Sequence, residues 1–192
     1  MQERLTRAAD RIISELENMD AGRPVLMCID GRCASGKSTL AALLAGRLEA
    51  NVVHADDFYL QPFQRTPERY AEPGGNLDRE RLLAEVIRPW QEKGAFSYRP
   101  YDAHDDTFGA AIDCPHRDVT IIEGSYSTHP DLWPAYDLHV FLTVDTKTQL
   151  HRIRIRNGEE GKKEFVERWI PLEEHYFGSS NPADRCELCF ET

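Results

Sequence analysis

Two closely spaced glycines, Gly31 and Gly36, constrain the fold of this chain more than any other feature. They lie in the segment Gly31–Ser38, which follows the spacing G-x-x-x-x-G-K-S. The short apolar stretch Val25–Ile29 lies just before this segment, and the run Thr39–Leu48, rich in alanine and leucine, follows it. A buried strand, a glycine loop and a helix in this order predict the strand–loop–helix unit of a phosphate-binding loop.

The predicted loop would bind an anion through its backbone. The two glycines permit dihedral angles that a Cβ excludes, so successive N–H groups can converge on a phosphate. The following helix adds unpaired N–H groups and the positive end of its dipole. In this Walker A pattern, Lys37 reaches the β- and γ-phosphates of a nucleotide and the Ser38 hydroxyl binds Mg²⁺. The expected nucleotide-binding residues are Gly31, Arg32, Cys33, Ala34, Ser35, Gly36, Lys37, Ser38 and Thr39.

Strands and helices alternate along the chain. Further strands are expected at 51–55, 119–122 and 138–144, with a last one through Phe190, and helices within 1–21 and at 78–93 and 146–156. Residues 61–77 should form a mobile loop, residues 94–117 should be irregular apart from a short strand near 97–101, and Pro171 should begin another helix. This alternation predicts an α/β fold: a doubly wound parallel sheet with helices on both faces, in a single domain over residues 1–192.

Composition disfavours several other classes of protein. A formal net charge of −10 argues against non-specific binding to nucleic acid or to an anionic membrane surface. No apolar run approaches the roughly 18 residues of a membrane span, and the start of the chain lacks the pattern of a secretory signal. We therefore expect a cytoplasmic protein that binds neither nucleic acid nor membrane.

The five cysteines, an odd number without a regular framework, are typical of reduced thiols. Cys186 and Cys189 are compatible with half a zinc site or with a terminal strand. The sequence offers no second pair of ligands at a suitable spacing, which favours the strand.

Carboxylates follow two of the predicted strands. Asp56 and Asp57 come directly after residues 51–55, and only one of them can easily face the nucleotide, because adjacent side chains leave a strand on opposite sides. That carboxylate could accept a proton from an attacking hydroxyl or hold Mg²⁺ through water; a solvated turn or a helix cap is the alternative. Glu123 ends the apolar run 119–122, where its charge would lie near Mg²⁺ unless it is a simple surface residue.

The densest cationic cluster, His151–Arg156, lies in the helix predicted at 146–156. Helical spacing places Arg152 and Arg156 on one face and Arg154 on another. Two guanidinium groups on one face suit the neutralisation of a phosphate during its transfer. A solvated helix surface is the competing interpretation.

Several short motifs resemble those of uridine kinases and occur in the same order. They are Gly31–Ser38, Asp56-Asp57-Phe58-Tyr59, Asn76-Leu77-Asp78, Arg99-Pro100-Tyr101-Asp102, Ile122-Glu123-Gly124 and Arg152-x-x-x-Arg156. The resemblance covers most of residues 22–192, and Asp-Asp-Phe-Tyr is its most specific part. The chain is thus similar to the P-loop kinases that include uridine kinase, phosphoribulokinase and pantothenate kinase. This resemblance implies a three-layer P-loop NTPase fold with a small helical lid at about residues 150–178.

The resemblance also implies roles for single residues. These are Asp56 as the catalytic base, Asp78 for sugar hydroxyls, Tyr59 and Tyr101 in the acceptor pocket, and Arg152 and Arg156 in the lid over the phosphates. Tyrosines at such positions often pack in a core instead. His104 corresponds to a residue that contacts the nucleobase, but it follows Tyr101 at a shorter spacing than in uridine kinases.

These features predict an enzyme that uses ATP and Mg²⁺ and transfers the γ-phosphate to a hydroxyl of a small metabolite, most simply the 5′-hydroxyl of a nucleoside. A kinase of another small alcohol, such as a sugar or a pantothenate-like compound, remains an alternative. A nucleotide-binding regulatory NTPase with a macromolecular partner is another. The resemblance to uridine kinases implies a homo-oligomer, which the sequence itself does not indicate.

Overall fold

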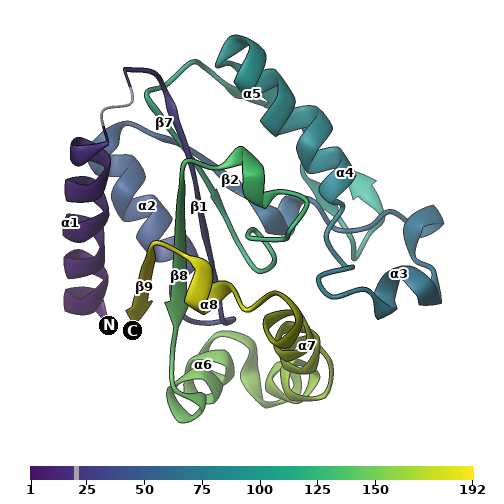
Figure 1. Cartoon of the computed structure of the whole chain (residues 1–192). Helices are drawn as coiled ribbons and strands as arrows, with labels where there is room; N and C mark the ends of the chain where they lie inside the picture. The colour runs from purple at the N-terminus through teal and green to yellow at the C-terminus, as the bar shows by residue number, and fades with distance from the viewer. Residues whose placement is uncertain (20–21) are drawn as a thin grey trace.

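Five parallel strands form the central sheet of the computed structural model, which describes residues 1–19 and 22–192. Across the sheet they follow the order β2 (Asn51–His54), β7 (Val119–Glu123), β1 (Val25–Gly31), β8 (Leu138–Thr143) and β9 (Leu188–Glu191) (Figure 1). Each neighbouring pair of strands is parallel. The predicted doubly wound α/β fold is therefore confirmed, and its terminal strand includes Cys189.

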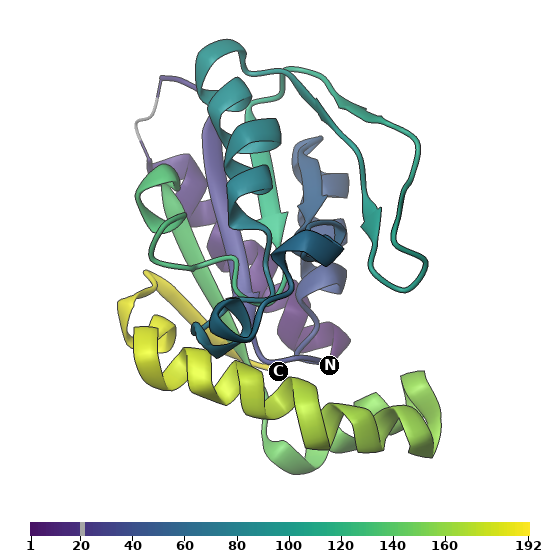
Figure 2. The ribbon, with the colours of Figure 1, turned by 90° about the vertical axis from the view of Figure 1, so that its right-hand side faces the viewer.

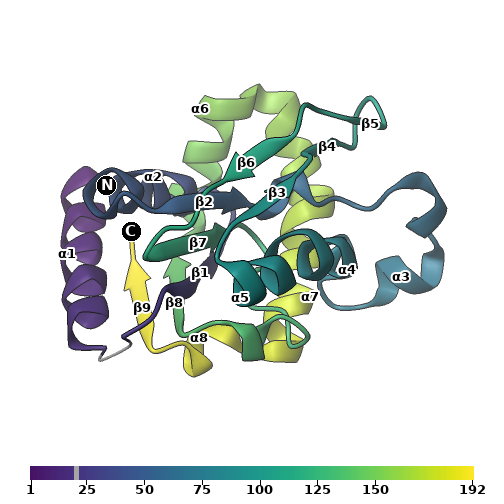
Figure 3. The same cartoon turned by 90° about the horizontal axis from the view of Figure 1, so that it is seen from above.

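Helices cover both faces of the sheet (Figures 1 and 3). One face carries α1 (Gln2–Asn18) and α2 (Lys37–Leu48), and the other carries α4 (Arg79–Leu82), the π-helical turn Leu83–Ile87 and α5 (Arg88–Lys93). The predicted N-terminal helix packs through Leu5 and Ile12, which are buried against β1 and α2. All seven residues of β1 are buried, as expected for a central strand covered on both sides.

A helical segment lies across the carboxyl ends of the strands (Figure 2). It consists of α6 (Thr146–Glu164), the π-helical turn Phe165–Trp169 and α7 (Ile170–Ser180), after which the short α8 (Pro182–Arg185) leads into β9. Gly158 interrupts α6 with a φ of 74°, close to the predicted end of that helix. Pro171 lies in the first turn of α7, but α7 continues directly from the π-helical turn, because Glu164, Phe165, Trp169 and Ile170 all have right-handed helical angles. The prediction that Pro171 begins a new helix rather than lying within one is therefore wrong. The π-helical turn before it accommodates the missing proline N–H.

Residues 94–117 are more regular than the sequence predicts. β3 (Phe96–Tyr98) pairs with β6 (Ile112–Cys114), and β4 (Tyr101–Asp102) pairs with β5 (Thr107–Phe108), in two small antiparallel ladders (Figure 2). The single strand expected near 97–101 is divided, because Pro100 has no N–H to contribute to a ladder.

The predicted loop 61–77 contains a 3₁₀ turn, Pro62–Gln64, and a short α-helix, α3 (Pro67–Ala71). Among the described residues, no helix combines the length and the apolar character that crossing a membrane requires.

Candidate active site at the carboxyl ends of the strands

A cavity of about 770 Å³ opens where β1, β2 and β7 end. Ligands of parallel sheets bind at this edge. Of the predicted site residues, those in its wall are Cys33, Ala34, Gly36, Lys37, Ser38, Thr39, Asp56, Tyr59, His104, Glu123, Arg152 and Arg156. Those outside its wall are Gly31, Arg32, Ser35, Asp78 and Tyr101. The fold thus brings most of the predicted motifs together from distant parts of the chain.

The glycine loop has the backbone that its motif requires. The φ angle is 136° at Gly31 and 102° at Gly36, in the region that favours glycine. A Cβ on Gly31 would lie 1.9 Å from the carbonyl oxygen of Leu142, so a side chain does not fit there. Lys37 Nζ donates to the carbonyl oxygens of Gly31 at 2.7 Å and of Arg32 at 3.0 Å. The ammonium group is therefore fixed beside the loop, within the wall of the cavity.

The side chains of Arg152, in α6, and Thr192, which follows β9, hold the outer loop residues Ala34 and Ser35. Arg152 Nη1 donates to the Ala34 carbonyl oxygen at 3.1 Å and to Thr192 Oγ1 at 3.0 Å. Thr192 Oγ1 in turn donates to the Ser35 carbonyl oxygen at 2.7 Å. One of the two predicted phosphate-neutralising arginines therefore also supports the loop directly.

Cys33 is the cysteine of the loop, and its side chain is buried. Desolvation, followed by the nearby charge of Glu173, raises the pKa of its thiol to about 12. Because the thiolate is the reactive form of cysteine, Cys33 is not an activated thiol.

The structure separates the two adjacent aspartates. Asp56 is exposed and lines the cavity, where Tyr59 Oη lies 3.4 Å from its carboxylate. Asp57 is half-buried outside the cavity wall and accepts a hydrogen bond from Tyr98 Oη at 3.1 Å. Desolvation raises the pKa of Asp57, and the bond from Tyr98 opposes that shift. Of the two carboxylates, Asp56 is the one that can reach a bound ligand.

Glu123 lies at the end of β7, 3% exposed, and its carboxylate is 2.5 Å from His54 Nδ1. That hydrogen bond raises the pKa of His54, and burial opposes it. Glu123 and the Ser38 hydroxyl line the same cavity, and both offer the oxygen ligands that Mg²⁺ prefers. In the described part of the chain, no group of three or more histidine, cysteine, aspartate or glutamate side chains could form a metal site. Two oxygen donors, from Glu123 and Ser38, fit a Mg²⁺ ion whose other ligands are phosphate oxygens and water.

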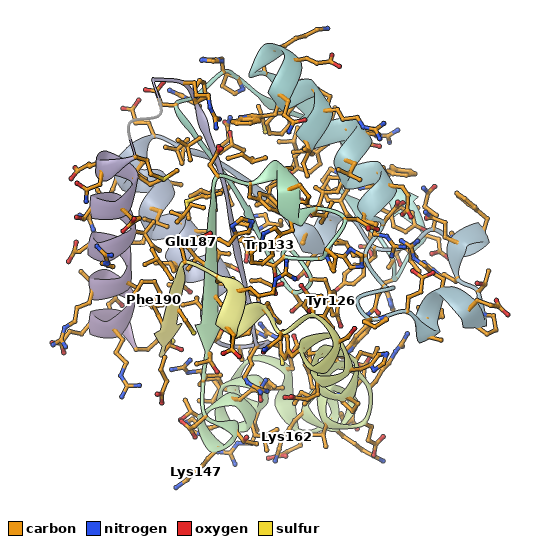
Figure 4. The ribbon with its side chains drawn as sticks, viewed as in Figure 1. Tyr126, Trp133, Lys147, Lys162, Glu187 and Phe190 are labelled. Atoms are coloured by element: carbon orange, nitrogen blue, oxygen red, sulfur yellow. The ribbon has the colours of Figure 1, made fainter. Side chains whose placement is uncertain are left out.

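The arginines of α6 are arranged as helical spacing predicts. Arg152 and Arg156 line the cavity, whereas Arg154 lies outside its wall and forms an ion pair with Glu159. The Arg156 guanidinium lies 5.4 Å from the centre of the Phe165 ring. Two lysines of the same helix, Lys147 and Lys162, lie at the outer edge of the molecule (Figure 4).

Two residues that the resemblance places at the acceptor lie elsewhere. Asp78 is 1% exposed and caps α4 by accepting the N–H of Arg81 at 3.0 Å. Tyr101 is 4% exposed, and its hydroxyl donates to Asp106 at 2.8 Å. Both side chains are occupied by local structure, a helix start and a β-hairpin, and neither reaches the cavity in this conformation.

Other residues of the cavity wall are not indicated by any sequence motif. They include Arg65, Tyr70, Ser125, Tyr126, Arg168, Trp169 and Glu173, whereas Asn76, which also lines the wall, belongs to the motif Asn76-Leu77-Asp78. Arg168 and Trp169 fall in the π-helical turn, where the Arg168 guanidinium lies 4.4 Å from the Trp169 ring centre. The ring centres of Trp169 and Tyr59 are 6.3 Å apart. The sequence offered one signal for Arg168 and Trp169: a cationic residue next to an aromatic residue within the predicted lid range.

No protein-family model and no curated protein sequence matches this chain. Solved structures do match it. A protein from Bacillus stearothermophilus described as a possible uridine kinase has a TM-score of 0.72 at 22% identity, over 98% of both chains. This chain has the fold of the P-loop kinases. A protein from Silicibacter sp. TM1040, provisionally described as a fructose transport system kinase, has a TM-score of 0.68 at 20% identity, over 97% of this chain and 98% of its own.

A third structure, D-glycerate 3-kinase from Cryptococcus neoformans var. grubii, has a TM-score of 0.63 at 16% identity, over 88% of this chain and 87% of its own. The resemblance to uridine kinase-like proteins is therefore confirmed at the level of the fold. The three proteins are named for different acceptors, so the fold alone does not select one.

Proposed function

We propose that this protein transfers the γ-phosphate of ATP to a hydroxyl group of a small molecule, with Mg²⁺ as its cofactor. The position of Asp56 carries the proposal. Its exposed carboxylate lines the same cavity as Lys37 and Ser38 of the glycine loop. A carboxylate in one cavity with a phosphate-binding loop suits the activation of an incoming hydroxyl.

The residues divide the chemistry as follows. The loop N–H groups and Lys37 bind the β- and γ-phosphates, and Asp56 accepts the proton of the hydroxyl as its oxygen bonds to the γ-phosphorus. The bond from that phosphorus to the bridging oxygen breaks, and ADP leaves. Arg152 and Arg156 neutralise charge on the transferring group. Magnesium, held by Ser38 and Glu123, would supply further neutralisation of the phosphate oxygens.

A nucleoside is our first candidate for the acceptor. Support comes from the Asp56-Asp57-Phe58-Tyr59 resemblance and from the aromatic side chains of Tyr59 and Trp169 in the cavity wall, which suit stacking on a planar base. In this proposal His104, also in the wall, contacts the base. The protein would act in the cytoplasm on a small molecule, and as an oligomer if it assembles as uridine kinases do.

A different small alcohol is the second candidate, and a specific observation favours it. Asp78, which the resemblance assigns to sugar hydroxyls, is committed to the cap of α4, and Tyr101 is committed to Asp106. For a nucleoside to use Asp78, this side chain would have to leave its cap. An acceptor recognised by other groups of the cavity needs no such change.

The test is ATP consumption with a panel of nucleosides, sugars and hydroxy acids, with the product identified by mass. Strong stimulation by one compound, and a product heavier by one phosphoryl group, would support the proposal and identify the acceptor. Slow ATP hydrolysis that no compound in a broad panel stimulates would instead support a regulatory NTPase.

A further inference from the structure

Glu173 lies at the phosphate-binding end of the cavity, although no sequence motif marks it. It belongs to α7, lines the cavity and is only 3% exposed. One carboxylate oxygen accepts the backbone N–H of Cys33 at 3.0 Å, and the other accepts the hydroxyl of Ser125 at 2.6 Å. A buried carboxylate is costly unless donors satisfy it, so these two bonds hold the side chain in place.

Ser125 connects this carboxylate to the lysine of the loop. Lys37 Nζ lies 3.4 Å from Ser125 Oγ, in addition to its bonds to the carbonyl oxygens of Gly31 and Arg32. Because Ser125 donates its proton to Glu173, the lone pairs of its oxygen are free to face the ammonium group. The relay Lys37–Ser125–Glu173 therefore restricts the direction in which the third N–H of Lys37 can point.

The helix that carries Glu173 is anchored to the start of the loop a second time. Tyr176, three positions along the same helix face, donates its hydroxyl to Asp30 at 2.9 Å. Asp30 is fully buried and also accepts the N–H of Gly31 at 2.6 Å. Because α7 is attached to β1 at Asp30 and to the loop at Cys33, it forms a fixed wall of the phosphate-binding end in this structure.

We infer that Glu173 is a positioning residue of the phosphate-binding loop: it orients Lys37 through Ser125 and fixes the N–H of Cys33. A loop that is held in this way is already ordered before the phosphates bind. No free energy is then spent on ordering it, which favours both phosphate binding and phosphate transfer. The effect on turnover rests on the proposed function. The effect on the loop itself is independent of any acceptor.

The alternative is that Glu173 competes with ATP for the phosphate site. If the carboxylate occupied the place of the γ-phosphate, ATP would have to displace it, and its removal would tighten ATP binding. The low exposure of Glu173 and the second anchor at Tyr176 favour the positioning role, because displacement would break both bonds of the carboxylate.

The test is a titration of the full chain with MgATP in a calorimeter, for Glu173→Ala, Ser125→Ala, the double variant and Glu173→Gln. We expect Glu173→Ala and Ser125→Ala each to weaken ATP binding about tenfold, the size of one hydrogen bond to a charged group. The double variant should be little weaker than either single one, because both substitutions break the same relay. Glu173→Gln retains an acceptor for the Cys33 N–H and a partner for Ser125, so it should restore most of the affinity.

Glu174→Ala is the matched control. Glu174 is the next residue of α7, but its carboxylate is half-exposed and pairs with the Arg32 side chain rather than with the loop backbone. The Glu174→Ala variant should bind ATP nearly as tightly as the wild type does. Hydrogen exchange of the nucleotide-free protein adds a readout that needs no ligand: the peptide covering residues 31–38 should exchange faster in Glu173→Ala and not in Glu174→Ala.

The inference would be overturned by tighter ATP binding in Glu173→Ala, by additive losses in the double variant, or by unchanged exchange of residues 31–38. Failure of the proposed function has a different signature. If the wild type binds ATP but phosphorylates nothing, the proposed reaction fails while the titrations still decide the role of Glu173. If it binds no ATP, hydrogen exchange still decides whether Glu173 holds the loop.

Discussion

The nucleotide end and the acceptor end of the cavity are built in different ways. The nucleotide end comes from one continuous segment, Gly31–Ser38, whose carbonyl and N–H groups are held by side chains such as Arg152 and Glu173. The acceptor end is assembled from side chains of separate segments, and one of them, His104, has a side chain that is 93% exposed. Phosphate binding is thus fixed by a supported backbone, whereas acceptor choice depends on side chains that can change without disturbing it.

The largest effect should appear where the two ends meet, at Asp56. Asp56→Asn removes the proposed base and should lower turnover by roughly 10²–10⁴-fold while leaving ATP affinity nearly intact. Asp57→Asn is the matched control, since Asp57 lies outside the cavity wall and bonds to Tyr98. Steady-state kinetics and ATP titration check both variants. Equal turnover of Asp56→Asn and wild type would remove Asp56 from the mechanism.

At the nucleotide end, Arg156→Ala should lower kcat by about tenfold to a hundredfold, because one charge that stabilises the transferring phosphate is lost. Arg154→Ala should have little effect, since Arg154 lies outside the cavity wall and pairs with Glu159 on the surface. Initial rates at saturating ATP compare the two. Similar losses in both variants would indicate a general requirement for positive charge on α6.

At the acceptor end, Asp78 distinguishes a structural role from a binding role. Asp78→Ala should lower the unfolding free energy by about 1 kcal/mol through loss of the α4 cap, and Asp78→Asn by much less, because asparagine also caps helices. Urea unfolding measures both. The KM of the acceptor should change little in Asp78→Asn. A large rise in that KM would show that Asp78 leaves its cap to bind the substrate, and would favour a nucleoside.

The smallest effect concerns the pH dependence of stability at Asp57. Burial raises the pKa of Asp57 in the folded protein above its ordinary value of 3.8, so the ionised carboxylate lowers stability at neutral pH. This penalty disappears as the pH falls below the ordinary pKa, where both states are protonated. Asp57→Asn should therefore be more stable than the wild type at neutral pH, with a smaller advantage near pH 4. If the stability advantage of Asp57→Asn grew as the pH fell, burial would not be the dominant influence on the pKa of Asp57.

Much of the fold is predictable from the sequence, because local patterns carry the information. The runs at 25–29, 119–122 and 138–144 become the three central strands, since a parallel strand covered on both faces is mostly apolar. The ladders of residues 96–114 are not predictable in the same way. Their strands have two or three residues each, which is too short for an alternating pattern to identify a strand.

The residues of the candidate site also differ in whether local sequence patterns predict them. The glycine loop and Asp56 can be placed because they follow strands directly, so their positions come from local structure. The role of Asp78 could not be predicted from the sequence, since an aspartate before a helix can either cap the helix or bind a ligand. Glu173 and Trp169 reach the cavity because the π-helical turn Phe165–Trp169 and α7 pack across the strand ends. Both residues fall within the expected lid range, but no local pattern of the sequence shows that their side chains line the cavity.

The central claim is that the glycine loop binds the phosphates of ATP. Calorimetric titration of the wild type with ATP in excess Mg²⁺ tests it most directly, with Lys37→Ala as the comparison. The structure predicts saturable binding of one nucleotide per chain, weakened about tenfold or more when the ammonium group is removed. Absence of binding to the wild type at millimolar ATP, or equal binding by both proteins, would contradict the account.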